Sequence, residues 1–190
     1  SLFEPTGAVT IRLKGTVSEK TPPLPSIGLE LLLDQTMTQT DFYGYGPDGA
    51  YIDTYSSRKL GRYSMPVSEN FEHYIKPQEN SSHYGTLWAI ICNEERCGLF
   101  FDSPKNRDFC YNASKYTPAM LEATKHDFEL RPLNATAVYL DYRMHSFSNN
   151  PQIAAKDPRR VLSEDAYDFE FRIQPFFGQN PFSMLSTIND

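Results

Sequence analysis

The sequence predicts an all-β protein, an antiparallel β-sandwich with long connecting loops and one short helix. Apolar and charged side chains alternate strictly along several segments, which is the pattern of strands buried on one face only. The chain also carries 13 Phe, 12 Tyr and 1 Trp, enough large side chains for a sizeable core. Antiparallel sheets commonly expose one face to solvent, so the alternation favours them over a parallel sheet covered by helices.

Alternating segments predict the individual strands in order along the chain. Four runs show the pattern, at residues 9–14, 27–33, 127–131 and 167–174. Residues 87–92 and 99–101 flank a polar stretch and predict a hairpin. Proline clusters fall between these runs, where turns are expected.

One helix is predicted after Thr117. The threonine can cap it, and Pro118 suits the first turn because proline lacks the backbone N–H that this position leaves unbonded. Met120, Leu121 and Thr124 would then face inward. The helix would be short.

The length of 190 residues suits a single domain, and no boundary interrupts residues 1–190. The longest polar stretch, 146–165, predicts a long loop. The end of the chain, 176–190, is poorly patterned and predicts a tail that crosses the surface.

The charge balance excludes several classes of partner. A net charge of −6 argues against a nucleic-acid binder and against an anionic membrane surface. No apolar run approaches the roughly 18 residues of a membrane span. The odd set Cys92, Cys97 and Cys110 does not suit a disulfide scaffold, so these residues are predicted as small buried side chains in a reducing, cytoplasmic setting.

Four phrases of the sequence resemble the C-terminal domain of bacterial β-galactosidases of glycoside hydrolase family two, and their order and spacing agree with that family. The first phrase is Phe42–Asp53, and the second is Tyr74–Asn80 followed by Trp88. The third is Asn112–Thr117 followed by Leu121, Ala123 and His126, and the fourth is Leu140–Arg143. The resemblance covers roughly residues 7–175. It implies a supersandwich shared with galactose mutarotase, of which this chain would be the last two thirds. Missing strands would leave an open sheet edge for another chain.

The resemblance implies that the chemistry lies elsewhere. Retaining glycosidases use two carboxyl groups about 5–5.5 Å apart, and in the family both belong to a barrel domain. Glu94 and Glu95 are adjacent and would point to opposite sides of a strand-like segment. We therefore expect no catalytic residue, no metal site and no cofactor in this chain, while the parent enzyme would use Mg²⁺ or Na⁺ in other domains.

Two loops are the expected sugar contacts, because sugars bind through aromatic faces and through amide and carboxylate hydrogen bonds. The resemblance assigns one to residues 44–53 and the other to residues 146–152. The chain departs from the family at Gly49, usually glutamate, for which Asp48 one residue earlier would partly substitute. In the second loop serines replace two glycines, and the position that is aromatic in some members holds Gln152, or Ile153 if one extra residue is allowed. The candidate sugar-binding residues are Gly46, Asp48, Tyr51, Phe147, Asn149, Asn150 and Gln152.

Structural roles are expected for other aromatic and histidine residues. Trp88 is predicted as a core residue and His126 as an interior histidine with satisfied hydrogen bonds. Tyr43, Tyr45 and Tyr51 suit turn packing and a ligand surface equally.

The resemblance predicts a non-catalytic domain that forms part of the sugar-pocket wall and of the subunit contacts in a β-galactosidase-like enzyme. The parent enzyme would hydrolyse terminal β-D-galactosides with retention. The alternative is a stand-alone carbohydrate-binding or interaction module whose pocket has decayed, which the serine-for-glycine changes favour. The expected partners are a galactoside sugar, the remaining domains of the glycosidase and a second copy of the chain in a homodimer.

Overall fold

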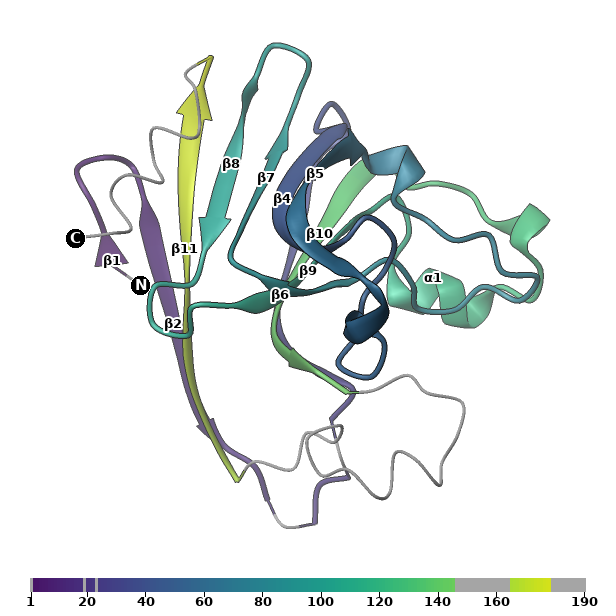
Figure 1. Ribbon diagram of the computed structural model, residues 1–190, viewed down its shortest axis with the longest axis horizontal. Coiled ribbons are helices and arrows are strands. Elements are labelled where there is room, and N and C mark those ends of the chain that lie inside the picture. Colours follow the sequence, from purple (N-terminus) through teal and green to yellow (C-terminus); the bar gives the residue numbers. More distant parts are fainter. Residues whose placement is uncertain (1, 19, 23, 146–164, 179–190) are drawn as a thin grey trace.

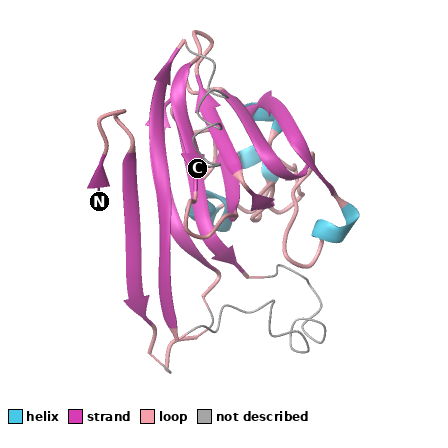
Figure 2. Cartoon of the chain, turned by 60° about the vertical axis from the view of Figure 1, so that its left-hand side comes forward, coloured by secondary structure: helices cyan, strands magenta, loops and turns pink. Residues whose placement is uncertain are grey.

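The computed structural model describes residues 2–18, 20–22, 24–145 and 165–178, which form two antiparallel sheets packed as a sandwich (Figure 1). The seven-stranded sheet has the order β1-β2-β11-β8-β7-β4-β5. Its strands are β1 Leu2–Phe3, β2 Val9–Thr16, β11 Ala166–Phe177, β8 Cys97–Asp102, β7 Trp88–Cys92, β4 Gln39–Gly46 and β5 Lys59–Pro66. Figure 2 shows the long strands of this sheet side by side, with short β1 at the N-terminal end.

The second sheet has four strands in the order β3-β10-β9-β6. They are β3 Ser26–Asp34, β10 Ala135–Met144, β9 Phe109–Ser114 and β6 His83–Thr86. A bulge interrupts the pairing of β10 with β3 between Asp141 and Arg143. The all-β sandwich predicted from the alternation is therefore confirmed.

Most predicted elements are present. The runs at 9–14, 27–33 and 167–174 become β2, β3 and β11, and β2 pairs with β11 so that Leu13 faces Phe169. The predicted hairpin is β7 and β8, which pair antiparallel with Cys92 opposite Gly98. The predicted helix is α1, Pro118–Ala123, and Thr117 Oγ1 accepts a hydrogen bond of 3.3 Å from Met120 N. Its Leu121 is buried.

The prediction of a strand at 127–131 is wrong. Residues Asp127–Glu129 form the 3₁₀ helix η3, and the Phe128 side chain is 76% exposed. The alternation is short, and a local capping interaction outweighs it, because His126 N donates to Glu129 Oε2 over 3.0 Å. His126 is exposed at this cap, so its prediction as an interior histidine is also wrong.

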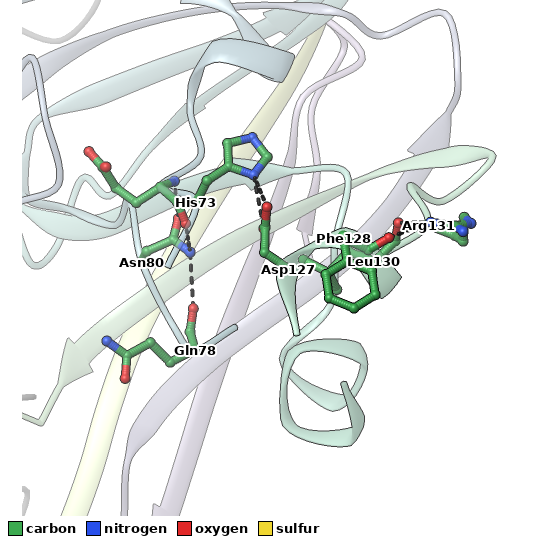
Figure 3. A network of polar contacts seen from close by, with 8 residues as sticks. His73, Gln78, Asn80, Asp127, Phe128, Leu130 and Arg131 are labelled. Atoms are coloured by element: carbon green, nitrogen blue, oxygen red, sulfur yellow. Dashed lines mark hydrogen bonds and ion pairs between the residues drawn. The ribbon is translucent and has the colours of Figure 1, made fainter. Parts of the chain in front are cut away.

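Contacts with a neighbouring loop hold η3 in place (Figure 3). His73 Nδ1 lies 2.9 Å from both carboxylate oxygens of Asp127. Asp127 N donates to Ile75 O over 3.1 Å, and the Arg131 guanidinium donates to Phe128 O over 2.9 Å. These bonds satisfy the backbone locally, so η3 needs no sheet partner.

Buried side chains form two clusters on opposite faces of the seven-stranded sheet. The main cluster lies between the sheets and takes Ala89 and Ile91 from β7. Trp88 and Ile90 alternate with them and belong to the second cluster, with Phe100 and Phe176. The prediction that Trp88 is a core residue is confirmed.

Several predictions concern single positions or the chain ends. Cys110 is buried, whereas Cys92 and Cys97 are half-buried, and all three are free. The predicted tail at 176–190 begins inside β11, where Phe176 is buried. The rest of that segment, 179–190, lies outside the described residues. Residues 146–164 of the predicted long loop also lie outside them. In the part of the chain that the structure describes, the helices are too short or too polar to span a membrane.

Candidate functional site

The loop that follows β4 carries three of the predicted sugar-binding residues. Gly46 is buried at the end of β4, and a Cβ atom there would lie 2.8 Å from the Tyr63 ring. The Asp48 side chain is 59% exposed, and its carboxylate lies 3.9 Å from the Arg58 guanidinium. Arg58 also donates through Nε to Gly49 O over 3.2 Å, which ties the two ends of the turn together. Asp48 thus presents a charge to solvent.

The Tyr51 side chain points away from solvent, towards Glu79 and Ser82. Its hydroxyl donates to Glu79 Oε1 over 3.4 Å and accepts from Ser82 N over 3.4 Å. Burial, followed by the nearby Glu79 carboxylate, raises the Tyr51 pKa well above 10. Tyr51 therefore holds the segment that precedes β6 against the loop, and the predicted sugar contact by Tyr51 remains a prediction.

Two carboxyl groups lie beneath this loop, and both titrate near neutrality. Burial raises the pKa of Asp141 from 3.8 to about 7. Burial and then the Asp141 carboxylate raise the pKa of Glu79 from 4.5 to about 7, although hydrogen bonds from Tyr51 and Asn112 oppose the rise. Glu79 also lines a hollow of about 290 Å³ beside α1. The sequence showed no signal that would bring these two acids together, since Glu79 belongs to a loop and Asp141 to a central strand.

A network of carboxamides and one histidine fixes the segment from residue 70 to residue 83. Asn70 Nδ2 donates to Asn112 Oδ1 over 3.1 Å, and Asn112 Nδ2 donates to Asn80 O over 2.9 Å. His83 is fully buried, stacks on Phe42 and lies 2.9 Å from Asn70 Oδ1 through Nε2. Burial lowers the pKa of His83 to about 4, so the ring is neutral at physiological pH. Such satisfied polar networks rigidify their surroundings.

The end of β10 meets the first candidate loop at Ser82. Ala50 N donates to Ser82 O over 2.7 Å, and the Ser82 hydroxyl donates to Met144 Sδ over 3.1 Å. His145, the next residue, donates its N–H to Pro25 O over 2.7 Å. The second candidate loop starts directly after His145, so the roots of both predicted sugar-binding loops lie on either side of one serine. Its residues Phe147, Asn149, Asn150 and Gln152 lie outside the described residues.

The three tyrosines left undecided by the sequence occupy three different environments. Tyr43 packs near Trp88 on the second cluster, and Tyr51 is turned inward. Tyr45 instead contacts Tyr55 and Tyr84, with ring centroids 5.1 Å and 6.3 Å away. Sequence reasoning missed Tyr55 and Tyr84, because one belongs to the 3₁₀ helix η1, Tyr55–Ser57, and the other to β6.

A metal site needs several histidine, cysteine or carboxylate side chains gathered at one point. Across residues 2–18, 20–22, 24–145 and 165–178, no three or more of them gather in a group that could hold a metal ion. The site as described therefore offers carboxylate, carboxamide and aromatic groups. These are the groups that bind the hydroxyls and the apolar faces of polyhydroxylated ligands.

The fold and this arrangement define a class of protein, a β-sandwich domain that gathers aromatic and carboxyl side chains where the loop after β4 approaches the end of β10. The chain belongs to the β-galactosidase small chain family, whose pattern it matches over residues 2–173. The four phrases that resembled a β-galactosidase C-terminal domain are thus confirmed as a family relationship.

Curated β-galactosidases are similar to most of this chain. The chain is 29% identical over 174 residues to the β-galactosidase of Actinobacillus pleuropneumoniae. The matched segment is 90% of this chain and 16% of that protein. It is 30% identical over 156 residues to the enzyme of Streptococcus thermophilus, covering 81% of the chain and 15% of that protein. The β-galactosidase of Lactobacillus delbrueckii subsp. bulgaricus is 35% identical over 123 residues, 65% of the chain. The chain thus corresponds to only about a sixth of the length of the first two relatives.

Proposed function

We propose that this chain is a non-catalytic C-terminal domain of a β-galactosidase and forms part of the wall of its sugar pocket. The enzyme as a whole would hydrolyse terminal β-D-galactosides with retention of configuration. One observation carries the proposal: Ser82 joins the loop at 44–53 to the end of β10, from which the loop at 146–152 departs. The first candidate loop and the strand end that precedes the second, far apart in sequence, therefore contact the same serine.

The division of labour follows from the proposed family role. The two catalytic carboxyl groups would lie in the rest of the enzyme, as would any Mg²⁺ or Na⁺, and this chain would need no cofactor of its own. Its contribution would be positioning, since a preorganised wall holds the sugar in the productive orientation. The rigid carboxamide network below the loops supports that role.

Contacts with other domains or with a second copy of the chain would use the sheet edges. Strand β3 lies at one edge of the four-stranded sheet, and its inward leucines Leu29, Leu31 and Leu33 are only half-buried. On its outer side, Leu32 is 64% exposed. An edge with unpaired backbone groups and apolar side chains can accept a further strand. This supports the proposed subunit contacts and the proposed larger, mutarotase-like supersandwich.

We also propose a cytoplasmic location. The cysteines are few, odd in number and free. Structural disulfides are usual in small domains of oxidising compartments and rare in the cytosol.

The test compares galactoside binding by the enzyme that contains this chain before and after loop substitutions. Asp48→Ala and Asn149→Ala should each raise the KM for a nitrophenyl β-galactoside severalfold while kcat changes less. Asn134→Ala, on an exposed residue between α1 and β10, is the matched control and should leave KM unchanged. Unchanged KM in both loop variants would contradict the proposal.

The stand-alone module is distinguished by calorimetry on the 190-residue chain. Millimolar galactose bound by the chain without any hydrolysing partner would favour the module. Absence of binding by both the chain and the intact enzyme would overturn the pocket-wall proposal.

A further inference from the structure

Three tyrosines from separate elements form a continuous aromatic cluster beside the first candidate loop. Tyr45 is the last residue but one of β4, Tyr55 lies in η1 and Tyr84 lies in β6. Their ring centroids are 5.1 Å apart for Tyr45 and Tyr55, 5.1 Å for Tyr55 and Tyr84, and 6.3 Å for Tyr45 and Tyr84. We call these three residues the tyrosine cluster.

The tyrosine cluster is half-exposed and its hydroxyls are uncommitted. None of the three hydroxyls has a hydrogen-bond partner among the residues that the structure describes, and each residue is half-buried. Other tyrosine hydroxyls of this protein are bonded: that of the buried Tyr111 lies 2.7 Å from Thr40 Oγ1, and that of the half-buried Tyr51 donates to Glu79. A core role would require such partners, because an unbonded buried hydroxyl is costly. The three rings therefore stay half-exposed, and their hydroxyls are not bonded to any residue that the structure describes.

A glycine beside the cluster allows the Tyr45 ring to pack closely on the backbone of β6. Gly85 adopts φ +64°, and a Cβ atom at this position would lie 3.0 Å from the Tyr45 ring. Glycine is favoured on both counts, the positive φ and the close approach of the ring. Tyr84 N donates to Ala50 O over 3.0 Å, which fixes the cluster to the loop that carries Asp48.

A charged pair, Asp108 and Arg143, acts electrostatically on Tyr84 of the cluster. Asp108 and Arg143 are 3.9 Å apart and each is about one third exposed. Both act on Tyr84, whose pKa burial raises first, Asp108 raises further and Arg143 lowers. Arg143 lies three residues before the loop at 146–152. A carboxylate and a guanidinium beside an aromatic face are suited to bind the hydroxyls of a sugar ring.

We propose that the tyrosine cluster is the aromatic platform on which the sugar ring rests, with Asp108 and Arg143 as hydrogen-bonding partners of its hydroxyls. The proposal rests on the proposed function and adds the residues that contact the sugar. The ligand would be a hexopyranose with one apolar face, the galactosyl unit of a β-galactoside.

The experiment measures KM and kcat for nitrophenyl β-galactoside, and the Kd of isopropyl β-D-thiogalactoside, in the enzyme that contains this chain. Tyr55→Leu should weaken binding about fivefold to tenfold, which matches the loss of one aromatic face. Tyr55→Phe keeps the face and should retain most of the affinity. Tyr74→Leu, on an exposed tyrosine of the loop before β6, is the matched control and should change nothing. Thermal unfolding of each variant checks that the fold is intact.

The outcomes separate this proposal from the proposed function. Weaker binding in Tyr55→Leu with an unchanged unfolding midpoint supports the platform. Unchanged binding in Tyr55→Leu while Asn149→Ala weakens binding overturns the platform and leaves the pocket-wall role standing. Unchanged binding in both variants overturns both. A Tyr55→Leu variant that fails to fold is replaced by Asp108→Asn, which should weaken binding and whose unchanged Kd would overturn the platform.

Discussion

The Tyr51 hydroxyl lies 3.4 Å from Glu79 Oε1 and closes the first candidate loop onto the segment before β6. This relationship separates two kinds of residue in a loop that the sequence presents as uniform. Asp48 faces solvent and is available to a ligand, whereas Tyr51 is committed to the protein. The loop can present ligand-binding groups because other members of it anchor the backbone.

Tyr51→Phe tests the anchoring role. Removal of the hydroxyl leaves Glu79 and Ser82 N without this partner, and we expect a loss of about 1 kcal/mol in the free energy of unfolding. Urea unfolding at pH 7 measures the loss. Tyr74→Phe, on an exposed side chain, provides the control and should be neutral. A neutral Tyr51→Phe would show that the loop does not depend on this contact.

The stability of the protein should depend on pH through Glu79 and Asp141. Their pKa values near 7 lie above the 4.5 and 3.8 of the free side chains, so the folded state holds these protons to a higher pH. Their contribution to the free energy of unfolding is therefore full below about pH 4 and falls as the pH rises towards 7. His83 acts in the opposite direction, because its lowered pKa costs stability as the pH falls from 6.5 towards 4.

Asp141→Asn separates these opposing contributions. The variant lacks the buried charge, so we expect its free energy of unfolding, relative to the unmodified chain, to be larger at pH 8 than at pH 5. The difference should be on the order of 1–3 kcal/mol. Urea midpoints at both pH values provide the measurement. Asp34→Asn is the control, since hydrogen bonds from Thr36 lower the Asp34 pKa below 3.8. Its carboxylate is ionised at both pH values, so the effect of this substitution should be the same at pH 5 and pH 8.

Alternation and cap residues predicted the strands and α1 because each depends on nearby sequence. The pairing of β2 with β11 joins residues about 155 positions apart, so Leu13 and Phe169 could be recognised as strand residues but not as neighbours. The alternation at 127–131 misled because a strand also needs a pairing partner, which alternation does not reveal; the local cap between His126 and Glu129 forms instead.

Prediction of the site was limited in a similar way. The family resemblance located Gly46, Asp48 and Tyr51 in one loop, but the direction of each side chain depends on contacts with residues 79–84. Tyr55 and Tyr84 join Tyr45 only because η1 and β6 meet in space. No sequence spacing predicts that η1 and β4 of the seven-stranded sheet will meet β6 of the four-stranded sheet.

Gly85→Ala should destabilise the protein through both the backbone and the Tyr45 ring. The positive φ disfavours a residue with a Cβ atom by about 1–2 kcal/mol, and the ring must shift to admit the methyl group. Gly15→Ala is the matched control, since a Cβ atom there would meet nothing within 4 Å. Differential scanning calorimetry of the two variants should show a lower midpoint for Gly85→Ala only. Equal midpoints would contradict the close packing of Tyr45 on Gly85.

The ion pair between Arg172 and Asp102 should be the most sensitive to loss of one partner. Arg172 donates through Nε to Asp102 Oδ1 over 2.9 Å and through Nη2 to Oδ2 over 2.6 Å, and the Asp102 side chain is 4% exposed. Arg172→Met strands a buried carboxylate and should cost about 3–5 kcal/mol.

Two further variants show whether that cost comes from the stranded charge. Adding Asp102→Leu to Arg172→Met removes the charge and should recover most of the stability. Arg62→Met breaks a similar fork to Asp41, but the Arg62 side chain is 52% exposed, so we expect a loss of only about 0–1 kcal/mol. Urea unfolding of the single and double variants measures the coupling. A double variant as unstable as Arg172→Met would mean that the arginine stabilises by packing rather than by charge, since its methylene stem would then be the part that the methionine fails to replace.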